Sequence, residues 1–164
     1  MKKLVTISRE YGSGGRIIGK LLAQKLGVPF YDKDELIELA AEQSGYAKEL
    51  LAGAELKAKN SFAYNLSSAL SFNEATSGSP LSVNEKLFLA TFQTIREIGE
   101  KGEAVIVGRC ADYALSDYNN CINLFIFGDD DVKTKRIMTK YDLTEAKAKE
   151  MITKKDKQRQ SYYN

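Results

Sequence analysis

The sequence has no histidine and no tryptophan, and its 164 residues include only two cysteines, Cys110 and Cys121, and two prolines. Without histidine, no imidazole is available as a general base or a zinc ligand, and the two cysteines do not form a paired zinc-binding pattern. We therefore expect reduced thiols that pack as small core residues, as in a cytoplasmic protein.

Long apolar stretches and a strong excess of one charge are also missing. No apolar run approaches the ~18 residues that a membrane-spanning helix needs, and the N-terminus does not have the apolar core of a signal peptide. Lys and Arg total 24 against 22 for Asp and Glu, which gives a net charge of +2. This balance predicts no general attraction to membranes or nucleic acids, so any anion site must be local.

Short apolar segments alternate with helical patterns along the chain. We expect strands at residues 3–8, 28–32, 103–108 and 121–127. The last two are nearly continuous apolar runs, which indicates strands covered on both faces. We expect helices at residues 16–26, about 34–45, 46–71, 84–101, 132–141 and 144 to about 161, with a loop at 73–82. This order predicts a three-layer α/β fold with a parallel sheet flanked by helices.

The stretch SREYGSGGRIIGK joins the first predicted strand to the first predicted helix. The first turn of a helix leaves backbone N–H groups without partners, and the helix dipole adds roughly half a positive charge there. Glycines let the backbone wrap closely around phosphate oxygens. The residues expected to bind a phosphate in this way are Gly12, Ser13, Gly14, Gly15, Arg16 and Ile17. The alternative is a tight strand–helix connection without a ligand.

The stretch departs from the usual phosphate-binding pattern, GxxxxGK[ST]. When Gly14 is taken as the second glycine, Arg9 replaces the first glycine and Gly15 replaces the lysine. Ile17 then lies close to the position of the hydroxyl that would hold Mg²⁺. We expect Arg16 to substitute for the lysine, because one lost charge-assisted hydrogen bond, worth about 1.5–3 kcal/mol, weakens such a site without abolishing it.

Further candidate residues follow other predicted strands, where ligands of open α/β sheets bind. Asp32 is expected to contact Mg²⁺ or the substrate or to act as a base, and helix capping is compatible with these roles. Arg109 is expected to bind a phosphate, with a surface ion pair as the alternative. The acidic residues 129–131 are interpreted as charges that open a helix. The segment 154–163 is interpreted as a solvated helix face, a lid over phosphates, or a nucleic-acid contact.

Three motifs in this order resemble the cytidylate kinase-like family, a branch of the P-loop nucleoside monophosphate kinases. They are TISREYGSGGRIIGKLLAQKLGVPFYDKDELIELAAEQSG, VIVGRCADY and KDKQRQSYY, and the resemblance covers nearly the whole chain. It implies a single P-loop NTPase-like domain over residues 1–164, with a helical monophosphate-binding insert at about 45–82 and a lid with C-terminal helices at about 128–164. It also implies transfer of the γ-phosphoryl group of ATP, with Mg²⁺, to a nucleoside monophosphate, with CMP or dCMP as the expected acceptor.

The resemblance also implies roles for single residues. Arg109 matches the arginine that grips the monophosphate, whereas Cys110 stands where those kinases have aspartate. Asp32 matches the aspartate that ends the second strand. Arg136 and Arg159 fall where lid arginines are expected.

Other departures from the family pattern keep alternatives open. A non-catalytic nucleotide- or anion-binding regulatory module is favoured by Gly15 in place of lysine, by Ile17, and by Glu38 where the family has a second phosphate-binding arginine. The stretch FYDKDELIE also resembles shikimate kinase, although that family's glycine-rich substrate motif is absent. Relatives continue into a last strand and helix, so we expect either a shortened chain or an unusually short member.

Overall fold

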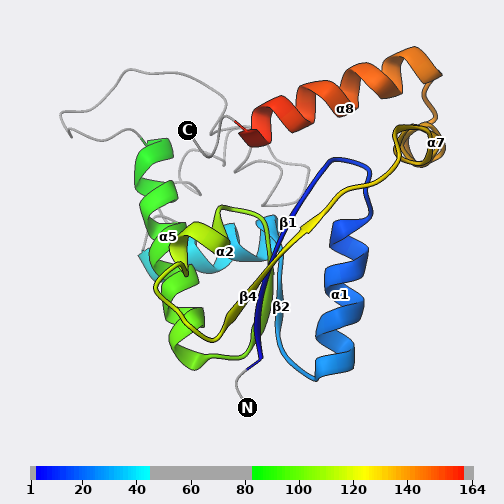
Figure 1. Ribbon diagram of the computed structural model, residues 1–164. Coiled ribbons are helices and arrows are strands. Elements are labelled where there is room, and N and C mark those ends of the chain that lie inside the picture. The colour runs from blue at the N-terminus through cyan, green and yellow to red at the C-terminus, as the bar shows by residue number, and fades with distance from the viewer. Residues whose placement is uncertain (1–2, 45–82, 161–164) are drawn as a thin grey trace.

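The computed structural model describes residues 3–44 and 83–160. The predicted helix at 46–71, the predicted loop at 73–82 and the predicted monophosphate-binding insert therefore lie outside the described residues. Within the described part of the chain, helices surround a parallel sheet (Figure 1).

The sheet contains four described strands in the order β2-β3-β1-β4. They are β1 (Leu4–Arg9), β2 (Phe30–Tyr31), β3 (Ala104–Val107) and β4 (Cys121–Ile126). Leu4 of β1 is in register with Ala104 of β3 on one side and with Cys121 of β4 on the other. Because all four strands run parallel, their carboxyl ends meet at one edge of the sheet, where three of the predicted site segments begin.

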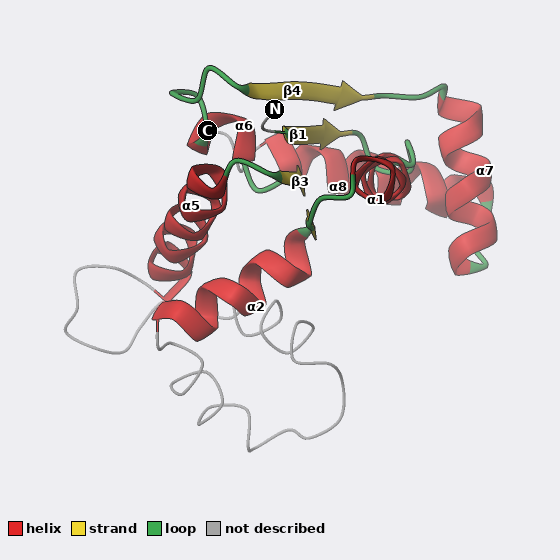
Figure 2. Cartoon of the chain, turned by 90° about the horizontal axis from the view of Figure 1, so that it is seen from below, coloured by secondary structure: helices red, strands yellow, loops and turns green. Residues whose placement is uncertain are grey.

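Alternate residues of the central strands face two different helix layers. Leu4, Ala104 and Ile106 belong to a core on the face that carries α2 and α5, whereas Val5 and Val107 pack toward α1 on the opposite face. Figure 2 shows the two helix layers on either side of the strands. The described helices are α1 (Gly15–Leu26), α2 (Lys33–Ser44), α5 (Val83–Lys101), α6 (Ala111–Ala114), α7 (Asp130–Tyr141) and α8 (Glu145–Gln160). The predicted α/β fold with a parallel sheet flanked by helices is confirmed.

Strand β4 was predicted to be buried on both faces, and this prediction is wrong. Ile122 is 60% exposed and Phe125 is 61% exposed. The reason is that β4 lies at the edge of the described sheet, where β1 is its one neighbouring strand. An apolar run specifies a strand, but it does not distinguish a central position from an edge position.

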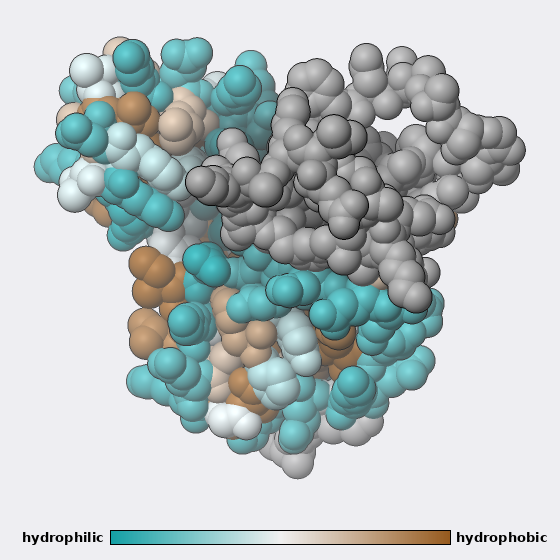
Figure 3. Space-filling model, turned by 180° about the vertical axis from the view of Figure 1, so that it is seen from behind, coloured by the Kyte–Doolittle hydropathy of each residue, from teal (hydrophilic) through white to brown (hydrophobic). Residues whose placement is uncertain are grey.

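Seen from behind, the surface of the described residues is largely hydrophilic, with hydrophobic groups at the side where α1 lies and in the middle of the face (Figure 3). On α1 itself, Ile17 and Leu21 are 62% and 54% exposed. A helix with the length and apolar character needed to cross a bilayer is not found among the described residues.

The two cysteines are free thiols, and Cys110 is buried. Burial, together with the negative charge of Asp112, raises the pKa of Cys110 to about 11 against the opposing effect of Arg109. The reactive form is the thiolate, so roughly one Cys110 in a thousand would be ionised at pH 8. Burial raises the pKa of Cys121 as well, so we expect both thiols of the folded protein to react slowly with a chromogenic disulfide at pH 8, Cys110 more slowly than Cys121, and both to react fast in denaturant. Two fast thiols in the folded protein would contradict this assignment.

Candidate phosphate-binding site

The glycine-rich stretch forms a tight turn between β1 and α1. Gly12 and Gly14 have φ values of 84° and 89°, a left-handed conformation that glycine adopts without a Cβ clash. Gly14 is the N-cap of α1 and provides no side-chain cap. The amides of Gly15, Arg16 and Ile17 then open the helix without intrahelical carbonyl partners. This is the geometry that the predicted anion site needs, and phosphate binding by these amides stays a prediction.

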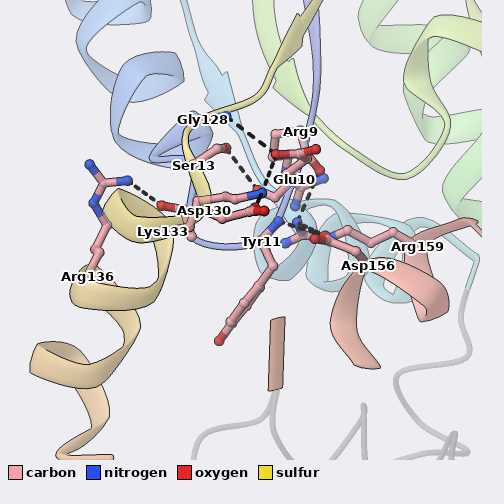
Figure 4. Close-up of polar contacts among 11 residues, drawn as sticks. Arg9, Glu10, Tyr11, Ser13, Gly128, Asp130, Lys133, Arg136, Asp156 and Arg159 are labelled. Atoms are coloured by element: carbon pink, nitrogen blue, oxygen red, sulfur yellow. Dashed lines mark hydrogen bonds and ion pairs between the residues drawn. The ribbon is translucent and has the colours of Figure 1, made fainter. Parts of the chain in front are cut away.

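Helix α7 holds the turn from one side (Figure 4). Lys133 is 5% exposed, and its Nζ lies 2.7 Å from both Glu10 Oε2 and Asp130 Oδ1. These two carboxylates raise the pKa of Lys133. Arg136 donates a hydrogen bond from Nη1 to the carbonyl oxygen of Gly12. Lys133 was not identified from the sequence, because its position on a highly charged helix gives no signal of burial.

Helix α8 reaches the turn from the other side (Figure 4). The backbone N–H of Tyr11 donates to Asp156 Oδ1 at 2.7 Å, and Arg159 Nη1 donates to the carbonyl oxygen of Arg9 at 3.1 Å. The Arg159 guanidinium also lies over the Tyr11 ring, 5.2 Å from its centroid. The region predicted as a lid therefore contacts the backbone of the residues that lead into the glycine turn.

Asp32 lies at the carboxyl end of β2 and is 4% exposed. Its Oδ2 accepts a hydrogen bond from Arg16 Nε, and its Oδ1 accepts one from the backbone N–H of Asp34 at 2.9 Å. Burial opposes ionisation of Asp32, but its hydrogen bonds with Glu35, Arg16 and the Asp34 amide together lower its pKa. Asp32 thus caps α2 and positions Arg16 beside the first turn of α1.

A magnesium ion would find few protein ligands here. Mg²⁺ binds through one or two carboxylates together with substrate phosphates. No group of three or more acidic, cysteine or histidine side chains suited to a metal ion occurs within residues 3–44 and 83–160. Both Asp32 carboxylate oxygens already accept hydrogen bonds, and the Ile17 side chain offers no oxygen. These residues do not fit a metal site built by the protein alone, and Asp32 as a metal ligand stays a prediction.

Arg109 lies in an unusual turn at the end of β3. Gly108, Arg109 and Cys110 have consecutive φ values of 84°, 61° and 52°. A left-handed conformation at a non-glycine residue costs on the order of 1 kcal/mol or more, and such strain is concentrated at functional sites. The turn brings Arg109 into the lining of the cavity described next.

A cavity of about 840 Å³ lies between the carboxyl edge of the sheet and α8. This volume is typical of small-molecule sites. Its cationic lining residues are Arg9, Lys33, Arg109, Lys155 and Arg159, and its acidic ones are Glu10, Asp34 and Asp156. Desolvation and the nearby charges of Arg109 and Lys155 lower the pKa of Lys33, against the effect of Asp34. Repulsion among these cations would be relieved by a bound anion.

The structure brings only some of the predicted site residues to this cavity. Arg109 and Arg159 line it, whereas Arg16, Asp32 and Arg136 surround the glycine turn and are not part of the lining. Lys33 was not identified from the sequence, and Lys155 was named only as part of the segment 154–163, for which a lid over phosphates is one interpretation. Their approach to Arg109 depends on how α2 and α8 pack, so no local motif reveals it.

Comparison with known proteins adds a family and a fold. The cytidylate kinase-like family matches residues 4–164. The crystal structure of an uncharacterized protein from Eubacterium ventriosum ATCC 27560 is similar, with a TM-score of 0.70 and 32% identity over 99% of this chain and 76% of that chain. Shikimate kinase from Bacteroides thetaiotaomicron shares the fold, with a TM-score of 0.54 and 15% identity over 99% of this chain and 82% of that chain. No curated protein matches the sequence.

Proposed function

The chain belongs to the cytidylate kinase-like family of phosphotransferases, and we propose that it transfers the γ-phosphoryl group of ATP to a nucleoside monophosphate, with CMP or dCMP as the acceptor. The observation that carries this proposal is the position of the cationic cavity. Arg109 lines it, and so do the last residues of β1, which lead directly into the glycine turn of α1. A donor site and an acceptor site would then adjoin, as transfer between two bound phosphates requires.

The donor would bind at the glycine turn. In this proposal the amides of residues 12–16 hold the donor phosphates. Those of Gly15 and Arg16 open α1 without intrahelical partners, and that of Ser13 would exchange its 3.4 Å hydrogen bond to the Glu10 carbonyl oxygen for a phosphate oxygen. Arg16 is held at this turn by Asp32, and Arg136 by the Gly12 carbonyl oxygen. Phosphoryl transfer depends mainly on alignment and on positive charge around the transferred group, and the turn offers both. Bound ATP would bring Mg²⁺ through its own phosphate oxygens, and the metal would offset part of their charge.

The acceptor would bind in the cavity through its phosphate. Arg109 carries a planar guanidinium that fits two phosphate oxygens, and Lys33 and Lys155 add charge beside it. Arg159 joins α8 to the backbone at the end of β1, so movement of α8 would open or close the cavity. Support for a cytosine nucleotide comes from the family, since the described cavity residues do not select a base.

A non-catalytic nucleotide-binding module is the second candidate. It is favoured by the pairing of Arg16 with Asp32, because this contact occupies the cation expected to replace the loop lysine. A shikimate kinase-like activity is supported by the shared fold alone, and no feature of the described site favours it.

The test is a coupled assay for ADP release with ATP and Mg²⁺, run across CMP, dCMP, UMP, AMP and GMP, with shikimate as a further acceptor. The proposal predicts ADP release that depends on a pyrimidine monophosphate and is greatest with CMP or dCMP. Nucleotide binding by calorimetry without turnover on any acceptor would instead identify the non-catalytic module. Turnover with shikimate alone would contradict the nucleotide proposal.

A further inference from the structure

Compared with the usual phosphate loop, a cation and a glycine have changed places at positions 9 and 15. In the pattern GxxxxGK[ST], a glycine stands at the position of Arg9 and a lysine at the position of Gly15. The structure places these two positions against each other. A Cβ atom added at Gly15 would lie 2.7 Å from Arg9 Cβ and 2.9 Å from Arg9 Cγ. Both distances are too short for carbon atoms, so the Arg9 side chain fills the space from which a lysine at position 15 would start.

The other end of the Arg9 side chain lies at the turn that carries Arg109. A Cβ atom added at Gly108 would overlap Arg9 Nη1 and lie 2.8 Å from Arg9 Cζ. Arg9 therefore extends from the first residue of α1 to the carboxyl end of β3, and glycines at both places leave room for it. Arg9 and Arg109 also line the same cavity. The Arg9 side chain thus passes the start of α1, and its guanidinium lies at Gly108, the residue before the proposed acceptor arginine.

The other predicted cations near the turn are held by protein groups and do not reach the cavity. Arg16 contacts the buried Asp32, and Arg136 contacts the Gly12 carbonyl oxygen. Neither residue lines the cavity. The Arg9 backbone, in contrast, is fixed by the hydrogen bond from Arg159, so docking of α8 sets the place from which the Arg9 side chain starts.

We propose that Arg9 supplies the cation that the loop lacks, by bringing its guanidinium from the opposite end of the loop to the phosphoryl group that is transferred. The inference rests on the proposed kinase activity. In the reaction, an oxygen of the acceptor phosphate forms a bond to the γ-phosphorus of ATP while the bond to the β–γ bridging oxygen breaks and ADP leaves. Arg9 keeps its protons throughout, and its charge offsets the negative charge on the transferred oxygens.

The proposal is tested by exchanging the two side chains. The variants are Arg9→Met, Arg9→Lys, Arg9→Gly and the double variant Arg9→Gly with Gly15→Lys. Lys25→Met serves as the charge-matched control, because Lys25 is exposed in the last turn of α1, at the end remote from the glycine turn. Affinity for ATP and for inorganic tripolyphosphate is measured by calorimetry, ADP release by the coupled assay, and folding by thermal unfolding.

Arg9→Met is expected to weaken tripolyphosphate binding about tenfold to a hundredfold and to lower kcat by at least as much, because one charge-assisted contact is lost. Arg9→Lys should recover part of both losses. The double variant should bind and turn over better than Arg9→Gly, since the lysine then starts from the space that Arg9 vacates. If Arg9 only supported the fold, adding Gly15→Lys to Arg9→Gly would not raise kcat.

The affinity for tripolyphosphate tests the role of Arg9 independently of the proposed kinase activity. If the wild-type protein releases no ADP with any acceptor, the kinase proposal fails, and the Arg9 cation is still judged by tripolyphosphate affinity. Arg9→Met that folds and binds tripolyphosphate as tightly as Lys25→Met would overturn the inference. So would a folded double variant that is no better than Arg9→Gly in both binding and turnover.

Discussion

Replacing Arg109 by methionine is expected to lower kcat/KM for the nucleoside monophosphate by about a hundredfold or more, the size of effect seen when one donor to a reacting oxyanion is removed. Arg109 is held in a left-handed turn, a strained conformation that places its side chain in the cavity beside Lys33 and Lys155. Because the acceptor site is separate from the glycine turn, the affinity for ATP should change little. Initial rates at varied acceptor concentration, with calorimetry for ATP, would measure both quantities.

Arg96→Met is the matched control for this prediction. Arg96 lies on α5 and contacts Asp117 and the Ala114 carbonyl oxygen, so its loss removes an arginine from outside the cavity. We expect near wild-type kcat/KM for this variant. If Arg109→Met were as active as Arg96→Met, the assignment of Arg109 to the acceptor site would be contradicted.

Replacing Lys133 by methionine is expected to lower the free energy of unfolding by about 1–3 kcal/mol, since a nearly buried ammonium group loses its charge-assisted hydrogen bonds. The contact with Glu10 should account for most of this loss, because the Asp130 side chain is 89% exposed and its ion pair is screened by water. Glu10 precedes the glycine turn, so weaker ATP binding is expected as well. Urea unfolding followed by circular dichroism, with calorimetry for ATP, would measure the two effects.

The control for Lys133 is Lys149→Met, which removes an exposed pair with Glu145 on α8. Its unfolding midpoint and ATP affinity should match those of the wild type. Equal stability of the two variants would show that the Lys133–Glu10 contact does not hold the loop.

The fold could be predicted from the sequence because its signals are local. Apolar runs bounded by glycine predicted the strands, and a helical spacing of apolar residues predicted α1 and α5. The exposed position of β4 could not be predicted in this way, since it depends on which strands lie beside it. The short helix α6 was also missed, because four residues are too few to show a period.

The candidate site was predicted less completely than the fold. The glycine turn and Arg109 follow predicted strands, so topology alone places them at one edge of the sheet. The pairing of Arg16 with Asp32 depends on the approach of α1 to the end of β2, and the burial of Lys133 depends on the packing of α7 against Gly12. Such contacts between distant segments leave no pattern in a single sequence.

The most direct test of the central claim is a titration of the ¹⁵N-labelled protein with ATP, followed by the backbone amide resonances. The account predicts that the amides of residues 12–16 shift on addition of ATP or tripolyphosphate and do not shift on addition of adenosine, because these N–H groups bind phosphate oxygens. Shifts by ATP that leave these five amides unchanged would contradict it.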